Sequence, residues 1–457
     1  MSRAQSTYPE QPTRTTRPPV GLPRLLAGVP AHGSLDLSEH HSLHGPLPEM
    51  TRFRRRRSEL IAEIEQAGLR GRGGASFPTA QKLEAVAASR GRPVVVINAA
   101  EGEPASSKDA TLTRALPHLI LDGGELAAQS LGASELIVAV NDSAIAGFES
   151  LATAIAERGT PARRSARIRL VGVPDRYVTG QETALVSHLN GGSALPTFAP
   201  PLPFEHGVAR RPTLVSNAET FAHIALIARH GARWFRELGT SAQPGSALVT
   251  LSGPVAYPGV YEIECGAPLG SVIDAAGGLS APARALLLGG YGGSWVPAEH
   301  LEDLCFSAEQ LAPYGASPGA GVIVVLSEAA CPVAETARLA RWLAGESAGQ
   351  CGPCLHGLGA LATTLETIAG QDAHAATRER VEQLLALVRR RGACAHPDGA
   401  ARLIQSAIDT FQSEFDEHAR YGTCERCLAP PELVLGQPRR TRHLSTRRAS
   451  LNPARRP

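Results

Sequence analysis

The stretch Gly71-Arg72-Gly73-Gly74-Ala75-Ser76-Phe77-Pro78-Thr79 is the most informative feature of this chain. Glycines let backbone N–H groups approach a phosphate closely, and a helix that begins after the loop adds the positive end of its dipole. Further along, the apolar run 94–97 is typical of a buried parallel strand, and the acidic loop Asn98-Ala99-Ala100-Glu101-Gly102-Glu103-Pro104 follows it. Ligands of open α/β sheets bind at this end of the strands. The two loops therefore predict a site for a phosphate-bearing cofactor.

The composition is that of an ordinary globular protein without a strong charge bias. Hydrophobic residues make up 43% and charged residues 19%, and the net charge of +2 predicts no general attraction to nucleic acid. No apolar run is long enough to cross a membrane, and the N-terminus lacks the apolar core of a signal peptide. We therefore expect a cytoplasmic protein without direct membrane insertion, in which the eight cysteines serve metal or redox chemistry more than disulfides.

The N-terminal half is predicted to contain an arm and an α/β domain. Residues 1–58 are expected to form a partly disordered arm, with His40, His41 and His44 in a solvated loop rather than a metal site. Residues 59–240 alternate between apolar strands and helices, which predicts a parallel sheet covered by helices. The strands are expected at 94–97, 135–140 and 168–173, and helices at 117–130 and 181–189.

The C-terminal half is predicted to contain two smaller domains and a tail. Residues 241–330 have the pattern of a β-grasp module, and residues 331–430 that of a four-helix bundle. Residues 431–457 are basic, without apolar periodicity, and are expected to be disordered. The module is expected to have a hairpin at 247–253 and 259–263, a helix at 269–276, a glycine-rich return at 288–296 and a strand at 322–326. The bundle helices are expected at 334–344, 356–368, 378–390 and 400–417.

Three cysteines of the helical region have the spacing of a metal-binding set. Cys351-Gly352-Pro353-Cys354 lies at the start of a helix, and Cys394 lies at a later helix break. One CxxC with a distant cysteine favours an Fe–S cluster over zinc, because zinc usually takes a second close pair; zinc and structural thiols stay open. A second CxxC, Cys424 to Cys427, lies just past the bundle. The cysteines expected to be isolated, and packed or inert, are Cys265, Cys305 and Cys331.

Four motifs, in this order, resemble those of the NADH-binding, FMN-containing subunit of respiratory complex I and of related diaphorase subunits. They run from Gly68 to Lys82, Asn98 to Pro104, Tyr177 to Leu185, and Pro212 to Thr220. The resemblance covers residues 59–420. It implies an α/β fold with a Rossmann-like FMN-binding domain, an SLBB-type β-grasp module and a C-terminal four-helix Fe–S bundle.

The resemblance also implies roles for individual residues. Glu103 and Glu182 face the nicotinamide side and are the catalytic candidates, and Cys351, Cys354 and Cys394 hold a [4Fe–4S] cluster. Simpler roles stay open: Asn98 and Asn217 as turn caps, Glu103 as an exposed loop carboxylate, and Tyr177 as a core residue. The residues implied to bind FMN are Gly71, Arg72, Gly73, Gly74, Lys82, Asn98, Tyr177, Gly180, Val215, Ser216, Asn217 and Thr220.

Two departures from the family pattern concern the cluster and the dinucleotide. Ala348 stands where the family has its first cluster cysteine. Three outcomes stay open: the cluster keeps three thiolates with another ligand, loses one iron to become [3Fe–4S], or is lost altogether. The candidate substitutes are His356, His396 and the pair Cys424 and Cys427. Ala85, Ala199 and Leu202 replace two aromatic residues and a lysine of the family's NADH site. Since an aromatic face contributes about 0.5–1.5 kcal/mol beyond burial, FMN is better supported than NADH.

The predicted function is FMN- and Fe–S-dependent electron transfer. The expected donor is NADH, or another low-potential donor such as ferredoxin, and the expected partners are ferredoxin or a [2Fe–2S] subunit. Two alternatives remain. One is a degenerate, non-catalytic scaffold subunit with a structural metal site, and the other is a zinc-stabilised domain at Cys351, Cys354 and Cys394.

Overall fold

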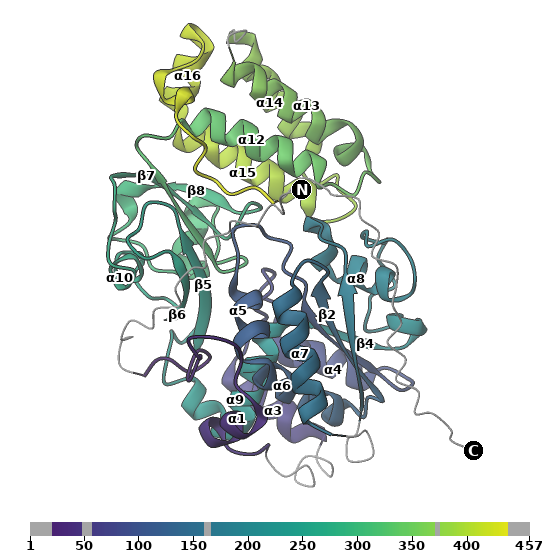
Figure 1. Cartoon of the computed structure of the whole chain (residues 1–457). Coiled ribbons are helices and arrows are strands. Elements are labelled where there is room, and N and C mark those ends of the chain that lie inside the picture. Colours follow the sequence, from purple (N-terminus) through teal and green to yellow (C-terminus); the bar gives the residue numbers. More distant parts are fainter. Residues whose placement is uncertain (1–20, 48–56, 160–165, 371–374, 437–457) are drawn as a thin grey trace, which may run out of the picture.

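The computed structural model describes residues 21–47, 57–159, 166–370 and 375–436. Figure 1 shows an α/β domain, a smaller sheet module beside it, and a group of helices that lies across one end of both. The predicted fold class is confirmed by the structure, which has a parallel sheet covered by helices, a second, mixed sheet and a C-terminal helical region. Much of the predicted disorder of the ends falls on residues 1–20, 48–56 and 437–457, which lie outside the described residues. The prediction is wrong for residues 431–436, because Leu433 is buried in the core of the helical region.

The first sheet is parallel throughout, in the order β3-β2-β1-β4. Its inner strand β1 (Val94–Ala99) is buried along Val94–Ile97, as a strand covered on both faces must be. Parallel strands end at one edge, and there Asn98 of β1 pairs with Asn217 of β4. This register brings the acidic loop and the last of the four motifs together. The other strands are β2 (Glu135–Asn141), β3 (Arg167–Val173) and β4 (Thr213–Asn217).

Helices cover this sheet, and two of them pack unusually close together. At Gly123 of α6 a Cβ atom would lie 1.8 Å from the carbonyl oxygen of Phe221 in α9. A side chain larger than hydrogen is therefore excluded from this crossing, which fixes α9 against α6 and β1. The helices are α3 (Arg57–Ala67), α4 (Thr79–Ala88), α5 (Lys108–Ala115), α6 (Pro117–Leu131), α7 (Ile145–Glu157), α8 (Glu182–Leu189) and α9 (Ala218–Phe235).

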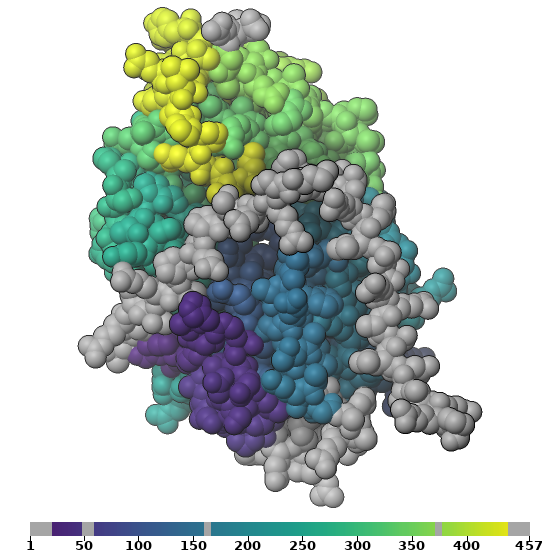
Figure 2. Space-filling model, viewed as in Figure 1, coloured from purple at the N-terminus to yellow at the C-terminus, as the bar shows by residue number. Residues whose placement is uncertain are grey.

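The prediction of a solvated loop for the N-terminal histidines is wrong. They lie in helix α1 (Leu37–His44), which packs on α6 and is coloured purple against the blue helices in Figure 2. His40 is fully buried, and its Nε2 lies 2.7 Å from Asp122 Oδ2 of α6. Burial alone raises the pKa of Asp122, but the His40 hydrogen bond and the nearby Arg158 and Arg229 outweigh it and hold that pKa well below its usual range.

The second sheet is mixed, in the order β6-β5-β9-β7-β8. The predicted hairpin is confirmed as antiparallel β5 (Ser246–Ser252) and β6 (Gly259–Glu264), and the last predicted strand as β9 (Val322–Ser327). The glycine-rich return joins β7 (Ala283–Leu288) to β8 (Ser294–Pro297). Two short helices complete the module, α10 (Leu269–Ala275) and α11 (Ala308–Leu311).

Among its described residues, the helical region has one more α-helix than the pattern predicted. The expected helix at 400–417 is two helices, α15 (His396–Thr410) and α16 (Gln412–Tyr421), because Phe411 leaves the helical conformation with φ −114° and ψ 35°. No proline or glycine marks this break. The preceding helices are α12 (Pro332–Gly345), the π-helical turn η6 (Pro353–Gly357), α13 (Leu358–Ala369) and α14 (Ala375–Val388).

No helix among the described residues has the length and apolar character needed to cross a membrane.

Candidate cofactor-binding site

The ends of β1 and β4 form the centre of the candidate site. Asn98 Nδ2 donates to the carbonyl oxygen of Gly180, 2.8 Å away, and so fixes the loop before α8 against β1. Asn217 caps α9 by accepting a hydrogen bond from the backbone N–H of Glu219, 3.0 Å away. Asn98 Oδ1 also accepts a hydrogen bond from the backbone N–H of Ala100 at 3.2 Å. Both asparagines therefore have the capping role that the sequence left open, and each lies at the strand edge where parallel α/β sheets commonly bind ligands.

The glycine loop closes over the start of α9. The backbone N–H of Arg72 donates to Thr220 Oγ1 at 3.0 Å, and a Cβ on Gly73 would lie 3.3 Å from Cβ of Asn217. The Arg72 side chain donates to the carbonyl oxygen of Ser246 in β5, 2.9 Å away. Arg72 thus joins the α/β domain to the second sheet. The glycines leave the loop backbone next to the N-terminus of α9.

Lys82 lies at the rim of the same site. Its Nζ lies 3.1 Å from the carbonyl oxygen of Val215 and 3.0 Å from Glu182 Oε2. Both the Lys82 and the Glu182 side chains remain about one third exposed. Lys82 therefore places an accessible cation between β4 and α8.

Glu103 is half-buried, not the exposed loop carboxylate of the simpler alternative. Its Oε2 accepts a hydrogen bond from the backbone N–H of Tyr291, 2.8 Å away, and Tyr177 bonds to the same carboxyl. Burial raises the pKa of Glu103 to about 7. A group with this pKa can hold or release a proton near neutral pH.

Tyr177 connects the strand edge with the helical region. Its ring packs edge-on against Trp342 of α12 and His396 of α15, with centroid distances of 5.3 and 5.4 Å. Its backbone N–H donates to Glu346 Oε2 at 3.0 Å. Glu346 ends α12 and precedes the cysteine loop, so one residue touches both predicted cofactor regions.

The three predicted metal-binding cysteines line one cavity of about 330 Å³. Ala348 lines it as well, at the place of the missing family cysteine. The remaining lining residues are Pro196, Thr197, Phe198, Gln350 and Ala393. The structure therefore brings Cys351, Cys354 and Cys394 together, although Cys394 lies far from the other two in sequence.

Models of known protein families match each of these regions. The Nuo51 FMN-binding domain model matches residues 64–226, the SLBB domain model residues 248–293, and the NADH-ubiquinone oxidoreductase-F iron-sulfur binding region model residues 334–418. The NADH-quinone oxidoreductase F subunit of Streptomyces coelicolor is 32% identical over 79% of this chain and 83% of that protein. The chain belongs to the family of NADH-quinone oxidoreductase F subunits.

A second relative and one solved structure agree. The corresponding F subunit of Escherichia coli is 30% identical over 78% of this chain and 84% of that protein. A chain of an NAD⁺-reducing [NiFe]-hydrogenase superposes with a TM-score of 0.74 and 31% identity. The match covers 81% of this chain and 65% of the hydrogenase chain. The protein is thus an NADH dehydrogenase-like oxidoreductase with an FMN-binding domain and a [4Fe–4S] binding region.

The residues present fit both groups. Around the strand edge, a Cβ on Gly102 would lie 2.6 Å from the Tyr177 carbonyl oxygen, and one on Gly180 would lie 3.0 Å from that of Ala100. Only glycine allows these loops to approach each other so closely, and together with Gly71–Gly74 they form a backbone cradle at the strand edge, which suits a ligand with a phosphate tail. Three cysteines around one cavity suit a cluster that keeps three thiolates.

The substitute cluster ligands predicted from the sequence do not line the cavity. His356 is exposed, and His396 is buried with its Nε2–H bonded to the carbonyl oxygen of Leu343 at 2.8 Å. Cys424 and Cys427 gather instead with Cys331, which is therefore not isolated. Among the described residues that line the cavity, the cysteines are those that the sequence predicted.

A buried charge group beneath the cradle was not predicted. Lys108 Nζ lies 3.0 Å from Asp109 Oδ1, 3.0 Å from Glu219 Oε2 and 3.1 Å from Asn217 Oδ1. Burial alone lowers the pKa of Lys108, but the charges of Asp109, Glu219 and Glu101 outweigh it and raise that pKa. Lysine is rare in this chain, which has only Lys82 and Lys108, and this rarity was the one signal available.

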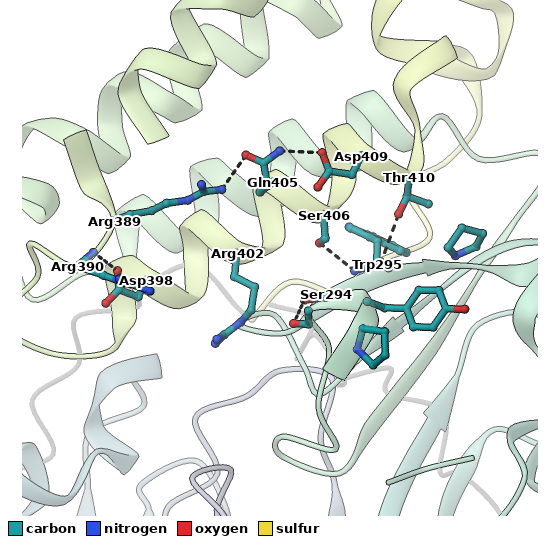
Figure 3. Close-up of a pocket in the computed structure, with 14 residues that line it drawn as sticks. Ser294, Trp295, Arg389, Arg390, Asp398, Arg402, Gln405, Ser406, Asp409 and Thr410 are labelled. Atoms are coloured by element: carbon teal, nitrogen blue, oxygen red, sulfur yellow. Dashed lines mark hydrogen bonds between the residues drawn. The ribbon is translucent and has the colours of Figure 1, made fainter. Parts of the chain in front are cut away.

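A larger cavity lies away from the cradle. It has a volume of about 800 Å³ and lies between β8 and α15, with Arg389, Arg390 and Arg402 on one side (Figure 3). None of the predicted site residues lines it. Of the replaced NADH-site residues, Leu202 is 43% exposed and Ala199 is exposed too, and neither side chain is aromatic.

Proposed function

We propose that this chain oxidises NADH with FMN held at the strand edge and passes the electrons to a [4Fe–4S] cluster at Cys351, Cys354 and Cys394. The observation that carries this proposal is the position of Tyr177. It bonds to Glu103 at the cradle and packs on Trp342 and His396 beside the cysteine loop. The flavin site and the cluster site then lie on opposite sides of this aromatic contact.

The cradle residues hold and orient the cofactor. The glycine loop Gly71–Gly74 and the turn from Val215 to Thr220 supply backbone N–H groups and the α9 N-terminus for a phosphate. Lys82 supplies the cation at the rim. Asn98 and Gly180, joined by their hydrogen bond, and Tyr177 form the wall on the side of the helical region.

Glu103 and Glu182 are assigned to the nicotinamide side. When bound, FMN supplies the hydride acceptor and releases electrons one at a time. Glu103, with its pKa near 7, exchanges a proton at its carboxyl oxygens while the Tyr291 N–H keeps that carboxyl in place. In the absence of a ligand, Glu182 pairs with the charge of Lys82 at the rim of the site.

The donor and partners belong to the same proposal. The hydrogenase relative is NAD⁺-reducing by its title, and the curated relatives are NADH-quinone oxidoreductase subunits, which supports NADH as donor. Ala85 and Leu202 weaken a dinucleotide site, so ferredoxin stays the second candidate donor. A [2Fe–2S] subunit or ferredoxin is the proposed partner, in the reducing environment of the cytoplasm.

The proposal is tested by the cofactor content of the anaerobically purified chain. We expect about one FMN and three to four irons with matching sulfide per chain. Cys351→Ser should remove most of the iron and leave FMN bound, whereas Cys265→Ser, at a buried cysteine that does not line the cavity, should change neither. Ala348→Cys should restore a fourth thiolate and slow the loss of iron in air.

Two results would contradict the proposal. A chain that takes up no FMN on reconstitution has no flavin function, and this would favour the non-catalytic scaffold. An iron content that Cys351→Ser does not lower would remove the cluster from the three-cysteine cavity.

A further inference from the structure

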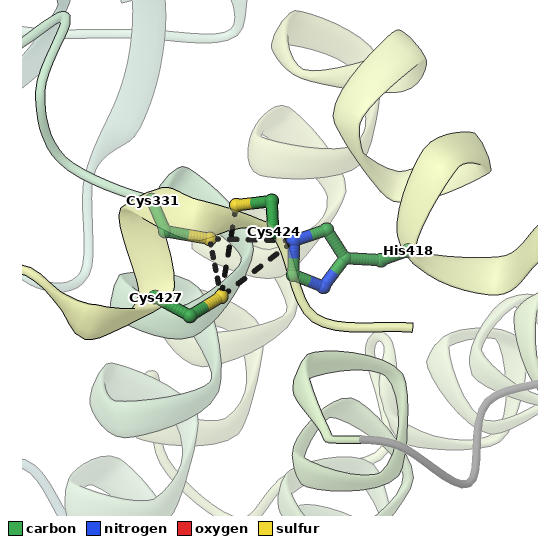
Figure 4. A group of neighbouring side chains, drawn as sticks. All are labelled: Cys331, His418, Cys424 and Cys427. Carbon is green, nitrogen blue, oxygen red and sulfur yellow. Dashed lines mark hydrogen bonds between the residues drawn. The ribbon is translucent and has the colours of Figure 1, made fainter. Parts of the chain in front are cut away.

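Four potential metal ligands gather in a second place, separate from the three-cysteine cavity. Cys331, His418, Cys424 and Cys427 place one sulfur or nitrogen atom each within 4.8 Å of all the others (Figure 4). They come from the start of α12, from α16 and from the segment around η7 (Glu425–Leu428). Cys331 and His418 are buried, and the other two are half-buried.

The distances fit a single tetrahedral ion. Cys424 Sγ and Cys427 Sγ are 3.7 Å apart, and Cys427 Sγ and Cys331 Sγ are 3.4 Å apart. His418 Nε2 lies 3.5 Å from Cys331 Sγ and 3.8 Å from Cys427 Sγ. A tetrahedral zinc ion, with bonds of about 2.3 Å to sulfur and 2.0 Å to nitrogen, sets its sulfurs about 3.8 Å apart and sulfur and nitrogen about 3.5 Å apart.

The histidine has the support that metal ligands usually have. Its Nδ1–H faces the carbonyl oxygen of Ile368, 3.2 Å away, so Nε2 directs its lone pair toward the three sulfurs. The CxxC pair also has a tight turn, since the N–H of Cys427 donates to the carbonyl oxygen of Cys424 at 3.0 Å. Three thiolates and one imidazole form a common structural zinc set.

A disulfide and a cluster of several irons both fit these four ligands less well than one ion does. The sulfurs are too far apart for a disulfide, whose S–S bond is about 2.05 Å, and three thiols cannot all pair. A cluster of two or more irons divides its ligands between metal atoms and so spreads them wider than this group. The iron-sulfur family model ends at His418 and leaves out Cys331, Cys424 and Cys427.

We propose that Cys331, His418, Cys424 and Cys427 bind one structural zinc ion, distinct from the [4Fe–4S] cluster. The ion joins the segment that contains Cys424 and Cys427 to the start of α12, through Cys331, and to α16, through His418. Beyond it, the backbone N–H of Glu432 donates to Glu335 of α12 at 2.8 Å, and the carbonyl oxygen of Val434 accepts a hydrogen bond from Tyr291. Tyr291 also holds Glu103, so zinc stabilises a segment that reaches the flavin cradle.

The test compares metal content between variants of the full chain. Zinc, iron and sulfide per chain are measured by elemental analysis and sulfide assay after growth with both metals. The wild type should hold about one zinc in addition to its iron. The Cys424→Ser/Cys427→Ser double variant should lose most of the zinc and keep its iron. Cys351→Ser should do the reverse.

Single-site controls separate ligation from packing. His418→Cys keeps a ligand and should retain zinc, whereas His418→Ala should lose it. Cys305→Ser, at a half-buried cysteine outside the group, should change neither metal. If the double variant fails to fold, the wild-type chain treated with a chelator and then Co²⁺ supplies the answer, because tetrahedral thiolate-bound cobalt has intense visible absorption bands.

Three outcomes would overturn the zinc site. The first is a wild-type chain with hardly any zinc and no cobalt bands. The second is a double variant that keeps its zinc. The third is a double variant that loses iron as Cys351→Ser does, which would make Cys424 and Cys427 cluster ligands.

Discussion

The two lysines of this chain have opposite surroundings, and their substitution should separate stability from cofactor binding. Lys108 is buried between Asp109 and Glu219, so Lys108→Met removes the cation nearest to both buried carboxyl groups and should cost about 3–5 kcal/mol of the free energy of unfolding. Lys82 is about one third exposed, and Lys82→Met should cost under about 1 kcal/mol. Denaturant unfolding of the FMN-free chain measures both.

For FMN affinity the order should be reversed, with Lys82→Met having the larger effect of the two substitutions. Fluorescence titration should show roughly tenfold weaker FMN affinity for Lys82→Met, because the accessible cation at the rim is lost. Equal destabilisation by the two substitutions would contradict the buried position of Lys108. Unchanged FMN affinity in Lys82→Met would contradict the rim position of Lys82.

Glu103 should make stability depend on pH near neutrality. Burial raises its pKa from 4.5 to about 7, so between these values the folded chain holds a proton that the unfolded chain has released. Stability contributed by this proton is complete below about pH 4.5 and is lost as the pH rises through 7. Glu103→Gln, which never ionises, should therefore lose less stability than the wild type between about pH 4.5 and 7.

Thermal unfolding of the FMN-free chain across this pH range measures the effect. Glu101, whose pKa burial and Asp109 also raise to about 7, should keep part of the slope in Glu103→Gln. The double variant Glu101→Gln/Glu103→Gln should have the smallest slope. Parallel curves for wild type and both variants would show that neither carboxyl is held in its neutral form.

At the scale of elements, the closest loop contact of the cradle involves Gly102. A Cβ there would lie 2.6 Å from the backbone oxygen of Tyr177, so Gly102→Ala must push the loop after β1 away from η2 (Tyr177–Gly180). We expect a loss of about 1–3 kcal/mol in stability and a markedly weaker FMN affinity. Gly359→Ala in α13 is the control, since nothing lies within 4 Å of its Cβ position. A fully FMN-loaded Gly102→Ala chain would refute the cradle.

Much of the element order could be predicted from local patterns. The run 94–97 is uniformly apolar because β1 is covered on both faces, and a turn sequence separates the two apolar runs that become β5 and β6. The break at Phe411 could not be predicted, because neither glycine nor proline marks it. The buried position of His40 depends on Asp122, which lies 82 residues away, and no local pattern records that pair.

The site residues also divide into those that a local sequence pattern reveals and those that depend on distant partners. Cys351 and Cys354 are recognisable because their spacing is local, and Cys394 because it ends a family pattern. Cys331 is 96 residues from Cys427, and nothing near it signals a ligand. Tyr291, which holds Glu103 from 188 residues away, was missed for the same reason.

At the scale of the whole molecule, the second sheet and the helices share one core. Trp295 of β8 is 1% exposed and packs on Phe411, with ring centroids 5.4 Å apart, in a cluster that also holds side chains of α12 to α15. Trp295→Ala should cost about 3–5 kcal/mol and raise hydrogen exchange in β7, β8 and α15 together. Ile145→Ala, at a 64% exposed position on α7, should leave exchange there unchanged. Faster exchange confined to β8 would contradict a common core.

Electron transfer from a flavin at the sheet edge to a cluster at Cys351, Cys354 and Cys394 is the property on which the proposed function depends. The most direct test is an anaerobic titration of the purified chain with NADH, followed at the flavin absorption band and by EPR. We predict that the flavin band bleaches and that the EPR signal of a reduced Fe–S cluster grows with it. Cys351→Ser should abolish the signal but not the bleaching. A flavin-loaded chain that shows neither bleaching nor a cluster signal with NADH would contradict this function.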